Sequence, residues 1–126
     1  MKNVEQLRAA HALRFWQSDA GRRWAAGDPG GAARDLATLI LQRGLLGAMG
    51  VARGQGGAAA AIAASIADFL SPAHLGLLPA AAPDPESLIQ VLTGERSDSL
   101  LLQRATSEAL IYLGHLRRLA PANPAR

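Results

Sequence analysis

The sequence lacks the residues on which several kinds of protein depend. Its 126 residues include no cysteine and only two Phe, two Trp and one Tyr. The missing cysteine excludes disulfides, thiolate metal ligands and thiol nucleophiles, which is compatible with a reducing cytoplasm. Residues 1–6 are polar and do not form a secretory signal. The longest apolar run, residues 58–64, is far shorter than the ~20 residues of a membrane span. We therefore expect a soluble, cytoplasmic protein without a membrane segment.

Patterns that indicate strands or catalytic sites are also missing. β-Branched and aromatic residues are scarce and no segment alternates between apolar and polar residues, so no strand is expected. The glycines of residues 54–57 follow no strand and precede no lysine, which excludes the common nucleotide-binding loops. His11, His74 and His115 fall on different predicted elements without an acidic residue at ligand spacing, and no serine sits in a nucleophile elbow. We expect no metal, no cofactor and no catalytic residue.

Arginine supplies almost all of the positive charge. Twelve of the 13 basic residues are Arg, Lys2 is the other, and with ten acidic residues the formal net charge is +3. The planar guanidinium suits phosphate and carboxylate groups better than a point charge does, so the composition favours a polyanionic partner. A modest excess is weak support for such a partner, and enrichment in Arg and Ala also follows from a GC-rich genome. Both interpretations stay open on composition alone.

Capping signals and an apolar spacing of three to four residues predict a first helix. Asn3 and Gln6 form a capping pair, and the helix is expected to run to the Gly27-Asp28-Pro29 stop. The predicted buried stripe consists of Ala9, Leu13, Trp16, Ala20 and Trp24. Trp16 and Trp24 are therefore expected in the core rather than as platforms for nucleic-acid bases.

The middle of the chain contains two interruptions between helices. A second helix begins at Asp28-Pro29 and ends at Gly44, and glycine-rich residues 44–57 predict a short, weak helix followed by a joint. An alanine-rich helix follows over residues 58–70. The Pro/Ala-rich residues 78–85 cannot form the interior of a helix and predict a connector across the surface.

Two further helices complete the predicted fold. One begins at Asp84-Pro85 and ends at Gly94, and the cap signal Ser97-Asp98-Ser99 introduces a long helix to Ala120, after which Pro121 prevents continuation. The sequence therefore predicts a single domain over residues 1–126. Its fold class is all-α, a compact bundle of five to six helices with long first and last helices.

The last predicted helix has one apolar and one polar side. At about 100° per residue, the apolar face consists of Leu102, Ala105, Thr106, Ala109, Leu110, Leu113, Leu116 and Ala120. The opposite side gathers Arg104, Ser107, Glu108, His115 and Arg118, with Arg117 near the edge of the buried face. This arrangement predicts an exposed basic surface. Cations in a last turn also stabilise the helix dipole, an alternative that requires no partner.

Three segments resemble one family in the right order along the chain. Residues 104–120 read RATSEALIYLGHLRRLA, residues 4–12 read VEQLRAAHA, and residues 42–45 read QRGL. They are similar to the closing helix, the opening and the glycine-leucine break of the small subunit of type III-B CRISPR effectors, the Cmr complexes. His115 departs from this likeness, because an aromatic residue is expected at its position. The resemblance covers the two ends well and the middle through helix spacing.

The resemblance implies a non-catalytic helical brace in antiviral defence. In that family, copies of the small subunit stack on one another and line the channel that holds guide RNA and target RNA, while cleavage belongs to other subunits. The expected partners are those subunits, both RNAs and further copies of the chain. Arginines on helix faces can neutralise phosphates without reading sequence. Arg104, Arg117 and Arg118 are candidate RNA or partner contacts, and His115 is a possible partner contact.

The first helix offers a second candidate surface. Arg8, His11, Phe15, Ser18 and Arg22 share a stripe predicted to lie opposite the buried one, with Arg23 nearby. Arg8, Arg22 and Arg23 are therefore also candidate RNA or partner contacts, and Phe15 is a possible partner contact. The alternative is a solvated face, or a Phe15 that another helix covers.

Two other classes of function remain open. A small helical enzyme with an arginine-lined anion site would require buried, paired arginines, whereas the arginines here fall mostly on outward stripes. A generic helical adaptor or DNA-binding protein is the other class. A helix-turn-helix reader would need a short turn followed by a polar helix, which the glycine-rich linkers do not supply.

Overall fold

Six α-helices make up the fold. A computed structural model describes residues 2–121, in which these helices occur without any strand. They are α1 (Val4–Gln17), α2 (Asp19–Trp24), α3 (Pro29–Gln55), α4 (Gly57–Leu70), α5 (Pro85–Thr93) and α6 (Ser99–Arg118). The predicted all-α bundle is confirmed.

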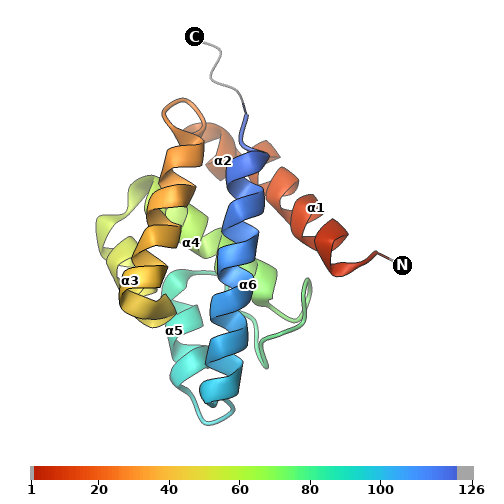
Figure 1. Cartoon of the computed structure of the whole chain (residues 1–126), viewed down its shortest axis with the longest axis vertical. Helices are drawn as coiled ribbons and strands as arrows, with labels where there is room; N and C mark the ends of the chain where they lie inside the picture. Colours follow the sequence, from red (N-terminus) through yellow and green to blue (C-terminus); the bar gives the residue numbers. More distant parts are fainter. Residues whose placement is uncertain (1, 122–126) are drawn as a thin grey trace.

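The core lies where α6 packs between α1 and α3. Figure 1 shows α6 in front of α4, with α5 below α3, and α6 contacts α1, α3 and α4 directly. The largest fully buried side chains are Tyr112, Phe69, Leu45, Met49, Ile62, Ile66, Leu70, Leu88, Leu113 and Leu116. They come from α3, α4, α5 and α6, so the central and carboxyl-terminal helices supply most of the apolar burial that stabilises the fold.

The predicted first helix is interrupted at Ser18. This residue has extended backbone angles, φ −72° and ψ 165°, and serves as the C-cap of α1 and the N-cap of α2. Its Oγ donates to the Phe15 carbonyl and accepts the Gly21 amide hydrogen at 3.2 Å. A β-carbon at Gly21 would lie only 1.9 Å from the Phe15 carbonyl oxygen, so the tight corner requires glycine. Ser-Asp is an N-cap signal in the middle of an apparently continuous pattern.

The buried side of α1 and α2 differs in part from the predicted stripe: Trp16 is buried, Ala9 and Trp24 are half-buried, and Leu13 and Ala20 are exposed. Leu13 is 43% exposed, whereas His11 and Phe15, predicted to point outward, are buried. Trp16 is buried as expected, and its indole N–H donates to the Leu116 carbonyl at 3.0 Å. Ala9, Leu13 and Trp16 all lie on α1, so the observed buried stripe of His11, Ala12, Phe15 and Trp16 is rotated about the helix axis from the predicted one.

A kink at Gly44 divides α3. Gly44 has φ 81° and ψ 166°, and helical geometry resumes directly after it. The predicted glycine break is therefore present, followed by a second helical segment that ends at a positive-φ joint, Gly56-Gly57. By length and composition α3 could cross a membrane, a test that the core helices of soluble proteins also pass. Here α3 packs against α4, α5 and α6 and exposes Arg34 and Arg43.

The connector between α4 and α5 is tied to the body of the protein. The Leu78 amide donates to the Leu70 carbonyl at 3.0 Å, and the Ala82 amide donates to Ser71 Oγ at 2.9 Å. Leu78 and Ala82 are buried, so the predicted surface connector packs part of its length against the core. The same segment carries His74, which it holds close to α1.

The predicted apolar face of α6 is largely correct. Ala105, Ala109, Leu113 and Leu116 are buried. Tyr112, absent from the predicted face, is also fully buried and stacks on Phe69 with ring centroids 4.7 Å apart. A buried tyrosine needs a partner for its hydroxyl group, and this partner lies on α1.

Candidate functional site

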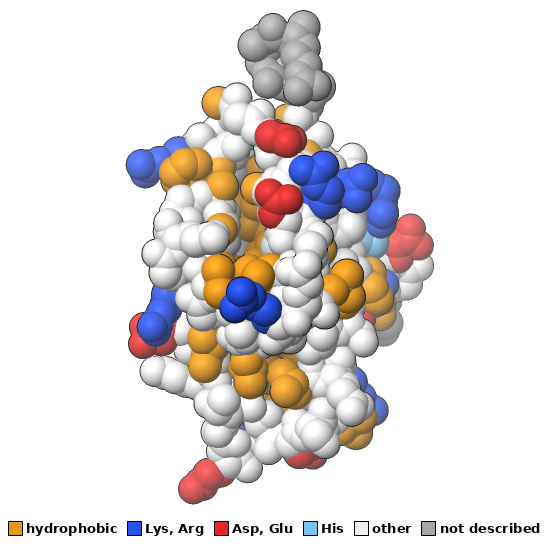
Figure 2. Space-filling model, turned by 60° about the vertical axis from the view of Figure 1, so that its left-hand side comes forward, with side chains coloured by type: hydrophobic (Ala, Val, Ile, Leu, Met, Phe, Trp, Pro, Cys, Tyr) orange, Lys and Arg blue, Asp and Glu red, His pale blue; other side chains and the backbone are white. Residues whose placement is uncertain are grey.

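One end of the bundle carries the end of α2, the beginning of α3 and the end of α6. Figure 1 shows these three segments at the top of the molecule, and α2 and α6 carry Arg22, Arg23, Arg117 and Arg118 there. All four residues are exposed. We call these four residues the arginine end. Figure 2 shows Lys and Arg side chains near the upper part of one face, with Asp or Glu side chains beside them.

The contacts within the arginine end leave its guanidinium groups accessible. Arg22 pairs with Asp19 at 3.1 Å, but both side chains are well exposed, so the pair is weak. Arg23 lies over the Trp24 ring at 5.2 Å from its centroid. A cation in this position can still accept a phosphate on its outer side.

The three α6 arginines do not form one continuous row. Arg104 and Arg118 are 14 residues apart, which places them on similar sides of the helix and about 21 Å apart along it. Arg118 folds back over Gly114, whose missing side chain leaves room for the guanidinium. Arg117 points elsewhere, and its stem lies against Gly30 of α3. The predicted basic surface is therefore divided between the arginine end and a separate Arg104.

Arg8 differs from the other candidate arginines because it has a partner inside the protein. Its Nε donates to Glu108 Oε2 at 2.9 Å and its Nη2 donates to Oε1, a two-pronged contact between α1 and α6. The side chains are 17% and 19% exposed. The hydrogen bond to Glu108 raises the pKa of Arg8 above its ordinary value. Its geometry is that of a structural ion pair.

Phe15 and His115 expose little side-chain surface that a partner could contact. Phe15 is 8% exposed and packs edge-on against Trp16, with ring centroids 5.0 Å apart. Its prediction as an outward residue was wrong, and the alternative of a covered side chain holds. His115 is half-buried, and its Nδ1 lies 3.1 Å from the Ile111 carbonyl oxygen one turn earlier.

A second feature is a chain of hydrogen bonds that passes through the core. Asp68 Oδ2 lies 2.8 Å from His11 Nε2, and His11 Nδ1 lies 2.6 Å from the Tyr112 hydroxyl oxygen. The same hydroxyl lies 2.6 Å from Ser65 Oγ. Three helices, α1, α4 and α6, thus meet through one polar chain, in which every buried polar atom has a partner.

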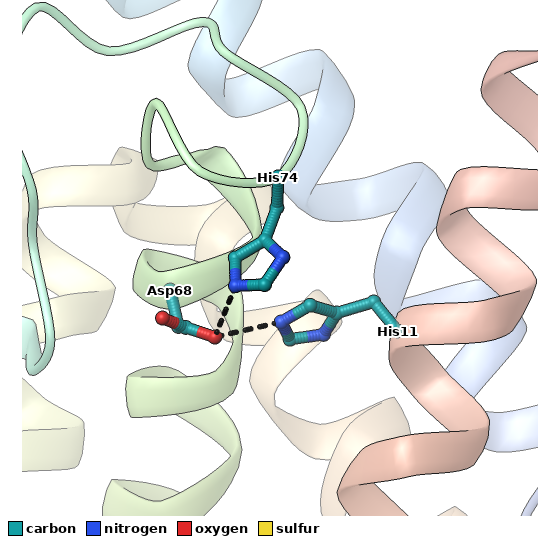
Figure 3. Close-up of side chains that lie close together, drawn as sticks. All are labelled: His11, Asp68 and His74. Atoms are coloured by element: carbon teal, nitrogen blue, oxygen red, sulfur yellow. Dashed lines mark hydrogen bonds and ion pairs between the residues drawn. The ribbon is translucent and has the colours of Figure 1, made fainter.

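His74 completes a cluster with His11 and Asp68. Its Nε2 lies 3.2 Å from the Asp68 Oδ2 that also faces His11, so both imidazoles converge on one carboxylate oxygen (Figure 3). The two imidazole rings meet edge to face with centroids 4.8 Å apart. Two surface hollows of about 430 and 510 Å³ both reach His11, Arg14 and His74. The cluster is therefore accessible from solvent on two sides.

Burial sets the protonation of the two deepest groups. Burial lowers the pKa of His11 below its ordinary value, against the opposing effect of the hydrogen bond to Asp68, so this imidazole is neutral at neutral pH. Burial also raises the pKa of Tyr112, which keeps its hydroxyl protonated. A neutral imidazole beside a carboxylate is competent both to donate a hydrogen bond and to bind a metal ion.

Sequence reasoning missed this cluster because its members are far apart in the chain. His11 and Asp68 are separated by 57 residues. A signal was nevertheless present, since Asp68 is the one charged residue in the apolar α4. The Asp68 side chain is 51% exposed, so water meets part of the charge, and a histidine is a suitable partner for its covered side. Spacing along the sequence could not identify which histidine.

Fold and surface together define a small all-helical protein with exposed arginines at one end and one polar cluster at its core. Comparison with protein-family models matches residues 4–123 to a family described as CRISPR-associated protein (Cas_Cmr5). The chain belongs to this family, which confirms the resemblance of its two ends to a small Cmr subunit. Searches of curated proteins and of solved structures gave no significant match.

Proposed function

We propose that this protein is a non-catalytic, cytoplasmic small subunit of a type III-B Cmr effector complex. It braces the complex by contacts with its sibling subunits and with further copies of itself. It lines the channel of guide RNA and target RNA through its exposed arginines. Family membership supports a role within a CRISPR effector complex, and the RNA contact rests on the surface chemistry described above.

The observation that carries the RNA contact is the arginine end. Arg22, Arg23, Arg117 and Arg118 come from two helices far apart in the sequence and are exposed at the same end of the bundle. Guanidinium groups held on rigid helices contact phosphate oxygens without reading base edges, so binding would tolerate any guide sequence. Arg104 would contribute a separate contact about 21 Å along α6.

Arg8 has a different role in this proposal from the one that the sequence suggests. Binding to RNA would require Arg8 to leave Glu108, with which it forms a largely covered pair. Loss of such a partner leaves a charge uncompensated between α1 and α6. Arg8 therefore supports the docking of α1, and the RNA contact falls to the five other arginines.

The arrangement does not favour the alternative of an enzyme with an arginine-lined anion site. Within residues 2–121 no two arginines lie together in the core. Arg8 is the least exposed arginine among the ion pairs there, and Glu108 neutralises its charge. An anion-binding pocket would need at least one guanidinium free to meet its substrate.

Reconstitution tests the brace directly. The sibling subunits and a guide RNA are assembled with and without this chain, and the complexes are compared by size-exclusion chromatography and target-RNA binding. We expect the chain to join the complex, to increase its target affinity and to show no turnover by itself. Failure to join a complex that contains all sibling subunits would contradict the proposal.

The arginine surface is tested by charge removal in the same complex. Arg104→Ala, Arg117→Ala and Arg118→Ala together should weaken target binding and reduce the salt dependence of log K by about 0.7–0.9 for each phosphate that is no longer neutralised. Arg22→Ala with Arg23→Ala tests the α2 contribution, and Arg8→Ala tests the first-helix alternative. A matched control removes three exposed arginines of α3, Arg34, Arg43 and Arg53. An equal weakening in that control would assign the effect to net charge alone.

A further inference from the structure

Three side chains from separate segments place metal-binding atoms around one point. His11 comes from α1, Asp68 from α4, and His74 from the connector that follows α4 (Figure 3). One ligand atom from each residue lies within 4.8 Å of the other two. Two imidazoles and one carboxylate are a ligand set that divalent first-row transition metals accept.

The distances suit an ion of the size of Zn²⁺. Zinc binds imidazole nitrogen and carboxylate oxygen at about 2.0–2.2 Å, so ligand atoms at a tetrahedral angle lie about 3.3 Å apart. The two nitrogen-to-oxygen distances here are 2.8 and 3.2 Å. The 2.8 Å distance must lengthen slightly, and the larger adjustment falls on the distance between the two imidazole nitrogens. His74 lies on a connector and is 26% exposed, so its ring has room to turn.

The hydrogen-bond chain behind His11 can adapt to an ion without any change in charge. In the protein without an ion, His11 carries its proton on Nε2, facing Asp68, and accepts a hydrogen bond from Tyr112 on Nδ1. With an ion on Nε2, the proton moves to Nδ1 and is donated to the Tyr112 oxygen at 2.6 Å, and Tyr112 in turn donates to Ser65. A second partner that fixes the ring in this way is typical of histidine ligands.

The surroundings leave room for water as well as for an ion. The Asp68 side chain is 51% exposed, and the two hollows beside the cluster provide a path from solvent. Arg14 lines both hollows and Lys2 lines one of them, and these cations oppose a second positive charge. Asp68 partly offsets them, and three protein ligands leave a coordination position open to water.

We propose that His11, Asp68 and His74 bind one divalent transition-metal ion of the Zn²⁺ type, with water completing its coordination. Hard cations such as Mg²⁺ and Ca²⁺ do not fit, because they prefer oxygen ligands throughout. The ion cross-links α1 to α4 and to the connector, which stabilises the seating of α1 on the bundle. This site does not depend on the proposed RNA contact.

The test uses the full, tag-free chain and Zn²⁺ as the probe. Competition against a chromogenic chelator measures affinity, and the visible spectrum of bound Co²⁺ reports the ligand geometry. We expect one ion per chain, with affinity at least tenfold lower for His74→Ala and for Asp68→Asn. His115→Ala is the matched control, because it removes the histidine outside the cluster. It should bind as tightly as the unmodified chain.

Each outcome decides the proposal. One ion per chain that depends on His74 and Asp68 but not on His115, with a Co²⁺ spectrum that disappears in the same variants, supports the site. Equal affinity of all four proteins, or no Zn²⁺ binding by the unmodified chain, overturns it, and the cluster is then a hydrogen-bond network only. Asp68→Asn preserves shape and volume, so it keeps the test valid if His74→Ala disturbs the connector. Circular dichroism verifies the fold of each variant.

Discussion

The polar chain in the core and the arginine end use charged residues in opposite ways. In the core, Tyr112 lies 2.6 Å from both His11 and Ser65, and His11 also lies 2.8 Å from Asp68, whose side chain is half exposed. At the arginine end, guanidinium groups are exposed and have at most weak partners. A polar group that is buried must be paired with another group of the protein, whereas a cation that faces water remains available to a partner outside. Changes in the core should therefore affect stability, and changes at the arginine end should affect binding.

The largest expected effect on stability is at Tyr112. Tyr112→Ala removes a fully buried ring that stacks on Phe69, and the free energy of unfolding should fall by about 3–5 kcal/mol. Urea denaturation measures this change. Tyr112→Phe keeps the ring and removes the hydroxyl group to which His11 Nδ1 and Ser65 Oγ are hydrogen-bonded, and this loss should cost about 1–3 kcal/mol. A Phe variant as stable as the unmodified protein would show that the polar chain contributes no net stability.

An intermediate effect on stability is expected for the ion pair of Arg8 and Glu108, which joins α1 to α6. A double-mutant cycle with Arg8→Ala and Glu108→Ala should give a coupling energy of about 0.5–3 kcal/mol, because the pair is two-pronged and largely covered. The same cycle on Arg22 and Asp19 is the control and should give a coupling close to zero, because that pair is exposed. Equal couplings would contradict the distinction between the two regions.

The smallest effect on stability is expected at the arginine end itself. Arg117→Ala combined with Arg118→Ala should change the free energy of unfolding by less than about 1 kcal/mol, since only the favourable interaction with the helix dipole is removed. Urea denaturation at low and at high salt measures it, and the small decrease should shrink as salt increases. A decrease of several kcal/mol would mean that these arginines stabilise the fold, which would weaken their assignment to RNA.

The helices, most of their ends and the family could be predicted from the residues alone. Caps at Asn3, Asp28, Asp84 and Asp98 and the break at Gly44 are local signals, because side-chain and backbone groups only a few residues apart create them. The apolar face of α6 was predictable for the same reason, since its spacing of three to four residues is a property of one helix.

The buried side of α1 and the pairing of the charges depend on how the helices pack together. Packing of α1 against α6 and α4 buries His11 and Phe15 and leaves Leu13 exposed. The Arg8–Glu108 pair spans 100 residues of sequence, and the His11–Asp68 contact spans 57. Such contacts depend on how separate helices pack, and no repeating pattern within one helix encodes them. The arginines were visible in the sequence, but their division into one structural residue and several exposed ones required the fold.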